Sequence, residues 1–295
     1  MIDSTPVEAS LLRLRRLSML DIPKSQSGKD VSEVAVPLMQ KTGELLLKRF
    51  DEEKNIREKG RANIVTDVDY EAEQLILATL RREYPNYGVL AEESGKAGEG
   101  DSPYVWIVDP VDGTRNYALG VPYFSTTIAL AHAGKVIYGI TYDPCRNELF
   151  EGRRGAGATM NGHSLRVSER SSLSMATIAT DMGYNDAMAG FALQLLDRLW
   201  PGMQAIRIMG SAALGLAYAA AGRTDVYFHH SLAPWDIAAG VVIAEEAGAV
   251  VTDRSGAPIS IDSPSIIVAN DALKEEFLQA TTGLAWREAE LTPND

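Results

Sequence analysis

The sequence predicts an α/β protein in which β-sheets are layered with α-helices. In its second half, strand-like apolar segments alternate with segments of helical spacing, an order typical of sheets covered by helices. In its first half, two helical segments are interspersed with short buried-looking strands. The length of 295 residues allows one large domain or two modest ones, and 45% hydrophobic with 23% charged residues is ordinary soluble globular usage.

Apolar spacing and turn residues define the elements of the first half in order. Val34, Leu38 and Leu45 recur at helical spacing, and a polar stretch separates their helix from a second one that Pro85 ends. Short apolar runs bounded by glycine and polar residues then indicate strands, two of which turn at Ala133-Gly134. The expected helices are 31–50 and 70–84, the polar stretch is 51–61, and the expected strands are 87–91, 104–108, 125–132, 135–142 and 149–151.

The second half is predicted to alternate between strands and helices, with Gly222 and Gly248 ending two of the helices. The expected strands are 176–180, 205–208, 224–228, 250–252 and 265–269, and the expected helices are 187–199, 212–221, 237–247 and 273–281.

Composition shifts predict four sections of chain. Residues 1–30 form an N-terminal extension and linker, which lacks the continuous apolar core of a signal peptide. Residues 31–155 form a first half that carries the metal site, residues 156–285 form a second half that completes it, and residues 286–295 form a tail.

Charge and cysteine content restrict the partners. A net charge of -12 disfavours nucleic acid and membrane surfaces as main partners, and it makes binding of an anionic substrate dependent on bound cations. The single cysteine, Cys145, cannot form an internal disulfide, which favours a reducing cytoplasm. No apolar run approaches the roughly 20 residues of a membrane span.

Acidic residues stand where predicted strands or loops end, the places where ligands gather in layered α/β folds. Carboxylate oxygens are the hard ligands that Mg²⁺ prefers. The acidic positions are Glu92, Glu93, Asp109, Asp112 and Asp236.

The segment 106–116, Trp-Ile-Val-Asp-Pro-Val-Asp-Gly-Thr-Arg-Asn, carries the strongest functional signal. An apolar strand delivers Asp109, Pro110 fixes a bend, and Asp112 follows three residues later, so that both carboxylates can aim at one point. Gly113 lets the backbone approach a bulky anion, and the amides of Gly113 and Thr114 point at a phosphate if a helix or tight turn begins there. The alternative is a type I turn, but the whole run after a buried strand favours function.

The other acidic positions have structural alternatives. The pair Glu92-Glu93 also fits a solvated loop, and Asp236 fits the N-cap of the Ala-rich helix that follows it as well as it fits a metal ligand. Thr66, Asp67 and Asp69 look like caps of the helix predicted from residue 70.

Several segments together resemble the inositol monophosphatase family of metal-dependent, lithium-sensitive phosphatases. The resemblance runs from about residue 31 to about residue 283, and its two signatures occur in order. The matching segments are 63–69, 91–94, 109–117, 234–240 and 245–248.

The resemblance implies an αβαβα five-layer sandwich, a homodimer, and catalysis with two or three Mg²⁺ ions. Mn²⁺ is implied as a substitute, and Ca²⁺ and Li⁺ as inhibitors. The implied ligands are Glu92, Asp109 and the Val111 carbonyl for one ion, Asp109, Asp112 and Asp236 for a second, and Glu92 with water for a third.

The resemblance also assigns residues to the reaction. Asp69 and Thr114 would orient or deprotonate the attacking water, with Glu93 nearby, which replaces the cap-only interpretation of Asp69. The implied substrate contacts are Asp112, Gly113, Thr114, Gly210, Ser211 and Ala212. Lys59 matches a lysine of an early loop. His229 stands where many inositol phosphatases have a glutamate that binds polyol hydroxyls, and a neutral histidine ring accepts a single hydrogen bond there.

The predicted function is that of an Mg²⁺-dependent phosphatase that hydrolyses a small phosphorylated metabolite, first of all an inositol monophosphate, by direct attack of metal-activated water. Fructose 1,6-bisphosphate, histidinol phosphate and a 3′-phosphorylated nucleotide are the alternative substrates. A non-catalytic regulator on the same fold, and a globular protein whose acids only cap and turn, are the alternatives from other classes.

Overall fold

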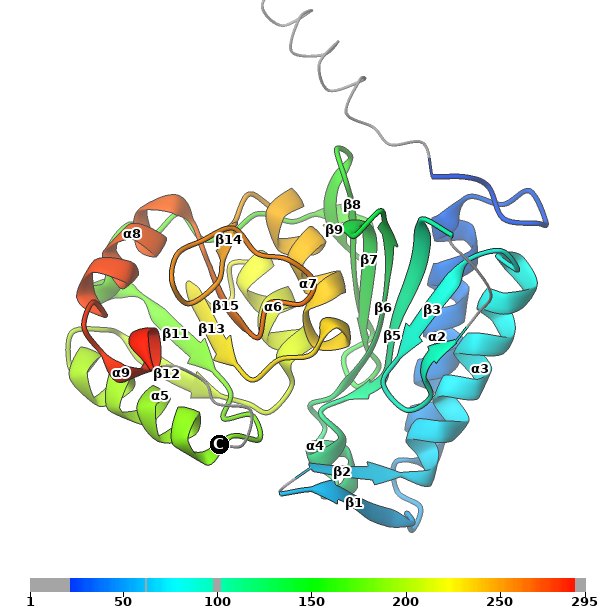
Figure 1. Cartoon of the computed structure of the whole chain (residues 1–295), viewed down its shortest axis with the longest axis horizontal. Helices are drawn as coiled ribbons and strands as arrows, with labels where there is room; N and C mark the ends of the chain where they lie inside the picture. Colours follow the sequence, from blue (N-terminus) through cyan, green and yellow to red (C-terminus); the bar gives the residue numbers. More distant parts are fainter. Residues whose placement is uncertain (1–21, 62, 98–101, 290–295) are drawn as a thin grey trace, which may run out of the picture.

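The computed structural model describes residues 22–61, 63–97 and 102–289. Helices and sheets alternate in five layers, which confirms the predicted αβαβα sandwich (Figure 1). Two outer helices cover an eight-stranded sheet, two helices lie in the middle, and a five-stranded sheet is covered on its outer side by α5 together with the last helices, α8 and α9. Residues 1–21 of the predicted extension and 290–295 of the predicted tail lie outside the described residues.

In chain order the elements are α2 (Val31–Arg49), β1 (Ile56–Gly60), β2 (Asn63–Thr66), α3 (Asp67–Glu83), β3 (Gly88–Ala91), β4 (Gly95–Ala97), β5 (Tyr104–Asp112), α4 (Thr114–Ala118), β6 (Ser125–His132), β7 (Lys135–Asp143), β8 (Glu148–Arg153), β9 (Gly157–Met160), β10 (His163–Ser164), the 3₁₀ helix η1 (Leu173–Met175), β11 (Thr177–Thr180), α5 (Asp186–Leu199), β12 (Ala205–Ile208), α6 (Ala212–Ala220), β13 (Val226–His230), α7 (Pro234–Glu246), β14 (Val250–Thr252), β15 (Ser265–Ala269), α8 (Asp271–Ala280) and α9 (Ala285–Glu288).

The eight-stranded sheet has the strand order β10-β9-β8-β7-β6-β5-β3-β4, with β3 and β5 parallel and the other neighbours antiparallel. Helices α2 and α3 pack on its outer face, where Leu38, Ile76 and Trp106 are buried in one apolar cluster. Asp30 caps α2 in a capping box with Glu33, which fixes where the first helix begins.

The five-stranded sheet has the order β12-β11-β13-β15-β14. Strands β12, β11 and β13 are parallel, so their carboxyl ends lie at one edge of the sheet, whereas β15 runs antiparallel to both β13 and β14. The outer cluster of this sheet buries Phe228 against Phe277 and Trp286. Trp286 is fully buried, so the packed structure continues past residue 285, where the predicted tail begins.

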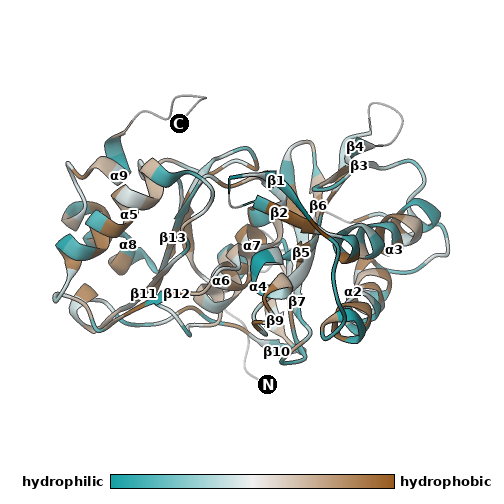
Figure 2. Ribbon diagram, turned by 90° about the horizontal axis from the view of Figure 1, so that it is seen from below, coloured by the Kyte–Doolittle hydropathy of each residue, from teal (hydrophilic) through white to brown (hydrophobic). Residues whose placement is uncertain are grey.

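Helices α6 and α7 lie between the two large sheets (Figure 2). Because sheets face them from both sides, most of the residues of α6 and the whole middle of α7 (237–244) are buried and apolar. Gly139 of β7 and Gly152 of β8 allow α7 to lie close to the sheet: a Cβ at Gly139 would come within 2.6 Å of Cα of Ala239. This close approach determines where the first turn of α7, with Asp236, lies relative to β5.

Several predicted boundaries differ from the structure. The stretch 51–61, predicted as polar and without an element, contains β1, which pairs with β2 in an antiparallel hairpin. Helices α3 and α7 begin three residues before the predicted starts, at Asp67 and Pro234. The first turn of α3 carries two aspartates, and that of α7 begins with proline, which is favoured at the first helical position. Strands β9 and β10 extend the eight-stranded sheet to Ser164, beyond the predicted division at residue 155.

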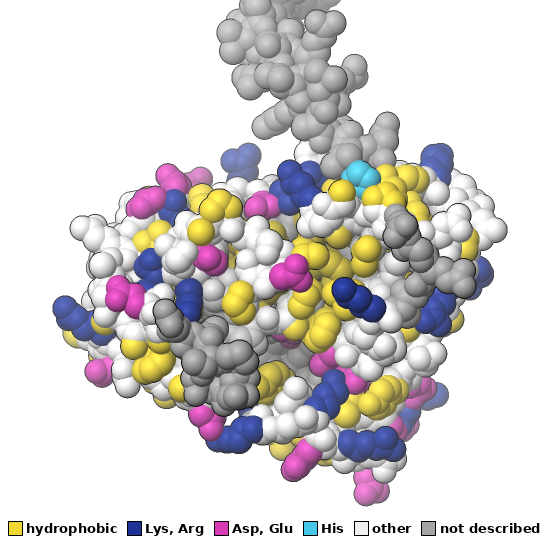
Figure 3. All heavy atoms as spheres, in the orientation of Figure 1, with side chains coloured by type: hydrophobic (Ala, Val, Ile, Leu, Met, Phe, Trp, Pro, Cys, Tyr) yellow, Lys and Arg dark blue, Asp and Glu magenta, His cyan; other side chains and the backbone are white. Residues whose placement is uncertain are grey.

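Within the described ranges, no helix has the length and apolarity needed to cross a lipid bilayer. On the face seen in Figure 1, acidic and basic side chains are interspersed rather than segregated (Figure 3).

Candidate metal centre and cleft

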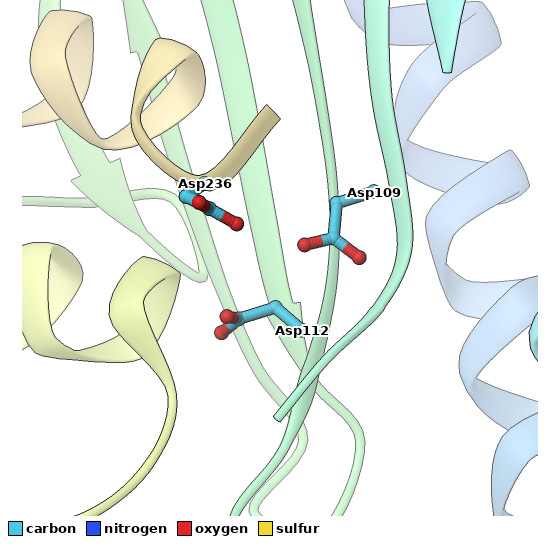
Figure 4. A group of neighbouring side chains, drawn as sticks. All are labelled: Asp109, Asp112 and Asp236. Carbon is cyan, nitrogen blue, oxygen red and sulfur yellow. The ribbon is translucent and has the colours of Figure 1, made fainter. Parts of the chain in front are cut away.

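Three aspartate side chains from distant parts of the chain converge at one point. Asp109 and Asp112 come from the end of β5, and Asp236 comes from the first turn of α7 (Figure 4). Each contributes one carboxylate oxygen to a group in which all atoms lie within 4.8 Å of one another. The structure therefore brings together three of the residues that were predicted to bind metal.

An irregularity in the β5–β6 ladder lets both aspartates of β5 point the same way. Asp109 pairs with Thr127 and Asp112 pairs with Ser125, so three steps on β5 face two steps on β6. In a regular strand, residues three apart point to opposite faces; the extra residue of a bulge restores one face. The predicted bend after Asp109 thus occurs inside the strand, which continues to Asp112 instead of ending at Asp109.

Asp236 accepts a hydrogen bond from the residue that precedes α7 and points into the cluster at the same time. The helix begins at Pro234, so the predicted N-cap role is wrong: the N-cap is Ala233, and Asp236 is the third helical residue. Its Oδ2 accepts the backbone N–H of Ala233 over 2.7 Å. The carboxylate is held by its own helix, which leaves capacity on it for a ligand.

Burial and mutual repulsion disfavour the charged form of these carboxyl groups. Burial is the main cause that raises the pKa of Asp236 to about 8 and that of Asp112 to about 6. Burial and the charges of Glu92, Asp112 and Asp236 raise the pKa of Asp109 well above its ordinary value. A divalent cation among the oxygens would remove the repulsion, and an all-carboxylate donor set suits Mg²⁺.

Glu92 and Glu93 lie beside this group and share one lysine. Burial raises the pKa of Glu92, and the nearby charge of Lys59 opposes this shift. Nζ of Lys59 lies 3.1 Å from Oε1 of Glu92 and 2.5 Å from Oε1 of Glu93. Burial raises the pKa of Glu93 to about 7, and its Oε2 is buried without a hydrogen-bond partner in the described part of the chain. An orphaned acidic oxygen at this place also fits a cation or a bound water.

Asp69 and Thr114 contact each other across the site. Thr66 is the N-cap of α3, and Oδ2 of Asp69 accepts its backbone N–H over 2.9 Å. The Oγ1 of Thr114 lies 3.0 Å from Oδ1 of Asp69 and 2.8 Å from the carbonyl oxygen of Val111. Burial raises the pKa of Asp69 to about 6. Asp69 therefore serves both as a cap and as a partner of Thr114, so its two interpretations are compatible.

A cleft of about 220 Å³ opens beside the cluster. A short helix, α4, begins at Thr114 after Gly113, whose φ of 88° favours glycine. Several residues predicted as substrate contacts line the cleft: Asp112, Gly113, Thr114, Gly210, Ala212 and His229. Ser211 does not line it; it caps α6 and donates its hydroxyl to Asp112.

Asp181, which the sequence analysis missed, holds the loop that carries Gly210. Its Oδ1 accepts the backbone N–H groups of Met209, over 2.9 Å, and of Gly210, over 2.5 Å. Its Oδ2 accepts the hydroxyl of Tyr227 over 3.0 Å. Asp181 directly follows a predicted strand, as Asp109 does. Its position at a strand end is therefore a sequence signal that could have identified it.

Comparison with known proteins agrees with this arrangement. The sequence model of the inositol monophosphatase family matches residues 28–285. The inositol-1-monophosphatase of Mesorhizobium japonicum is 38% identical over 84% of this chain and 94% of its own length. The Nus factor SuhB of Vibrio cholerae is 37% identical over 83% of this chain and 93% of its own length.

A solved structure supports the same assignment. The extragenic suppressor protein suhB of Bartonella henselae superposes with a TM-score of 0.82 at 37% identity, covering 86% of this chain and 98% of that one. Because both the sequence and the fold match over most of the chain, this protein belongs to the inositol monophosphatase family.

Proposed function

We propose that the protein is an Mg²⁺-dependent phosphatase that hydrolyses small phosphate monoesters, with inositol monophosphate as the first substrate to test. The observation that carries this proposal is the convergence of Asp109, Asp112 and Asp236 within 4.8 Å beside a cleft. An acidic chain repels a phosphate ester unless cations lie at the same place, and this cluster is where they would lie.

The proposed ligands are Glu92, Asp109, the Val111 carbonyl, Asp112 and Asp236, for two or three ions. When bound, Mg²⁺ neutralises phosphate oxygens, lowers the pKa of water and stabilises the leaving alkoxide. Oδ1 of Asp112 accepts one hydrogen bond, from Ala212, and so keeps a lone pair for a ligand.

The chain's own residues would bind the phosphate and handle the proton. We assign phosphate binding to the backbone amides of Gly113 and Thr114, which lie at the start of α4 and line the cleft beside the acidic cluster. Oγ1 of Thr114 would orient the attacking water, and Oδ1 of Asp69 lies within reach of that hydroxyl to accept the proton. Glu93 is a nearby second acceptor, since its Oε2 has no partner among the described residues.

The reaction balances without a covalent enzyme intermediate. The water oxygen forms a new bond to phosphorus, the bond from phosphorus to the ester oxygen breaks, and the leaving alkoxide takes up a proton to give the alcohol and inorganic phosphate. Trapping a phosphorylated residue during turnover would contradict this scheme.

Phosphate release from inositol, sugar and nucleotide monophosphates, measured with Mg²⁺ and with EDTA, tests the proposal. We expect release with Mg²⁺, partial replacement by Mn²⁺ and inhibition by Li⁺ and Ca²⁺. Release that persists in EDTA, or no release from any ester with Mg²⁺, would rule the proposal out.

A regulatory binding role is a second candidate, because a relative that is 37% identical is named a Nus factor. The intact acidic set favours catalysis, and the two roles are separable. A variant that has lost phosphate release but still binds its partner would demonstrate the second role.

We also propose a cytoplasmic homodimer, on the basis of the family resemblance and the single cysteine. Light scattering of the purified full chain measures the oligomeric state, and a monomer would contradict it.

A further inference from the structure

The short helix α9 is anchored to two neighbouring parts of the fold. It lies beside α5 (Figures 1 and 2). Nη1 of Arg254 donates to the backbone carbonyl of Trp286 over 3.2 Å, and its Nη2 donates to that of Ala289. Nη1 of Arg287 donates to the carbonyl of Leu278, in α8, over 3.1 Å. These bonds fix the backbone that carries the fully buried indole of Trp286.

The indole of Trp286 is hydrogen-bonded to a buried histidine at the end of β13. Its Nε1 lies 3.1 Å from Nδ1 of His230, and Nε2 of the same imidazole lies 3.0 Å from the carbonyl oxygen of Met182. An indole N–H only donates and a carbonyl only accepts, so Nδ1 of His230 has to accept and Nε2 has to carry the proton. Burial lowers the pKa of His230 to about 4, which agrees with a neutral ring. Trp286 therefore fixes the tautomer in which His230 donates to Met182.

Met182 belongs to the loop that joins β11 to α5, and residues 181–184 of this loop line the cleft. Among the hydrogen bonds of the described residues, the bond from His230 alone reaches the backbone of residues 182–184. The loop also packs tightly here, because a Cβ at Gly183 would lie 3.2 Å from the carbonyl oxygen of His230 and 3.3 Å from Cε1 of His229. The position of this side of the cleft thus depends on the two histidines.

We propose that Trp286 and His230 are positioning residues for substrate binding, because together they hold the loop 181–184 where it contacts the bound substrate. Among the described residues that line the cleft, neither Trp286 nor His230 appears, so both act through the carbonyl of Met182. The residues assigned above to metal and phosphate lie on other elements, β5, α4 and α7. This inference rests on the proposed phosphatase function and adds to it a contribution from the C-terminal helix.

The first test removes the indole N–H and keeps an aromatic ring. Trp286→Phe retains packing against Phe228, whose ring centroid lies 4.9 Å from that of Trp286, but it lets the proton of His230 move to Nδ1. In the full chain with Mg²⁺, we expect KM for inositol 1-phosphate, or for the ester hydrolysed fastest in the screen above, to rise about tenfold. The kcat should change less than about twofold, because a loop contact is present in both the bound substrate and the transition state. The concentration of Mg²⁺ for half-maximal activity should not change.

Two substitutions of His230 separate its two hydrogen bonds. The amide nitrogen of glutamine reaches about as far as Nε2 of histidine, so His230→Gln can still donate to Met182. The amide oxygen of asparagine reaches about as far as Nδ1, so His230→Asn can still accept from Trp286 but cannot reach Met182. We expect His230→Gln to retain a KM near that of the wild type, and His230→Asn to raise KM as Trp286→Phe does.

Phe277→Leu is the control for general loss of stability. Phe277 is fully buried in the same apolar cluster as Trp286, and its ring centroid lies 5.5 Å from that of Phe228. Its apolar side chain makes no hydrogen bond to the loop 181–184. The variant should lower the midpoint of urea unfolding and leave KM unchanged.

Two measurements do not depend on turnover. The chain has four histidines, so ¹⁵N NMR of histidine-labelled protein reports the tautomer of each one. We expect the proton of His230 on Nε2 in the wild type and partly on Nδ1 in Trp286→Phe. Hydrogen exchange at the amides of residues 182–184 should be faster in Trp286→Phe and His230→Asn than in the wild type.

A wild-type His230 that carries its proton on Nδ1 would overturn the inference. An unchanged KM in Trp286→Phe, or an equal rise of KM in Phe277→Leu, would do the same while leaving the phosphatase intact. If no ester is hydrolysed with Mg²⁺, the phosphatase proposal fails. In that case faster exchange in Trp286→Phe would still support the connection from Trp286 to the loop, and unchanged exchange would reject it.

Discussion

The backbone N–H of Ala212 donates to Oδ1 of Asp112 over 3.1 Å, although 100 residues separate the two in the chain. Oδ2 of the same carboxylate accepts from the backbone of Ala213 over 3.1 Å and from the hydroxyl of Ser125 over 3.2 Å. Asp112 thus joins the end of β5 to the first turn of α6. A residue proposed as a metal ligand is in this way held by both halves of the molecule.

Asp109→Asn should abolish turnover while the fold persists. Asparagine keeps the oxygen that accepts the Val111 N–H at 3.0 Å, but it removes a charge from the proposed ion site. Mutating a residue that only supports a metal ligand typically lowers metal affinity or activity by about 10–100-fold. Because Asp109 is proposed as a ligand itself, we expect kcat/KM to fall by about 100-fold or more. Phosphate release and circular dichroism measure the two effects. Asp197→Asn, an exposed change on α5, is the control, and near-normal rates in Asp109→Asn would contradict the assignment.

The metal-free protein should lose stability as the pH rises from about 5 to about 8. The folded chain keeps a proton on Asp236 up to a pKa of about 8, whereas the unfolded chain releases it near the ordinary value of 3.8. The folded state therefore binds more protons between these values, and each such group lowers the free energy of unfolding by at most about 1.4 kcal/mol per pH unit.

Thermal unfolding in EDTA across this pH range measures the effect. Saturating Mg²⁺ should flatten the profile and raise the midpoint most at high pH, and Asp236→Asn should flatten it without metal. If the unfolding midpoint in EDTA rose with pH, this would contradict a raised pKa of Asp236 in the folded chain.

Asp181→Ala should destabilise the fold by about 3 kcal/mol or more, because it leaves the N–H groups of Met209 and Gly210 and the hydroxyl of Tyr227 without their acceptor. Asp181→Asn retains an oxygen for the two amides and should cost clearly less. Urea unfolding gives both free energies. Equal losses in the two variants would show that the carboxylate does not act through these hydrogen bonds.

Gly139→Ala should destabilise by about 1–3 kcal/mol and weaken the response to Mg²⁺. A Cβ there would lie 2.6 Å from Cα of Ala239 and 2.8 Å from its carbonyl oxygen, so α7 would have to move and carry Asp236 with it. The matched change Gly190→Ala meets no atom within 4 Å on α5 and should stabilise by about 0.5–1 kcal/mol. Urea unfolding with and without Mg²⁺ measures the free energy of unfolding of both variants. Equal changes in the two variants would contradict the predicted clash between residue 139 and α7.

The local pattern of the sequence was enough to predict most elements and much of the candidate site. Apolar spacing predicted the helices that become α2 and α5, and the apolar run before Asp109 predicted β5. Asp109 and Asp112 were selected by the segment that follows an apolar strand, whereas Asp236 remained open between cap and ligand until the family resemblance assigned it to metal. These predictions succeeded because periodicity and turn chemistry act over a few residues and are visible in the chain itself.

Other features depended on partners that no local pattern contains. The chain alone determined that Asp109 and Asp112 follow an apolar strand. Only the ladder with β6 decided that both point to one face, because side-chain direction in a strand is set by register with its neighbour. Likewise, the hydrogen bonds of Asp181 and the contact between His230 and Met182 arise where separate strands end together, and that proximity exists only after the chain has folded.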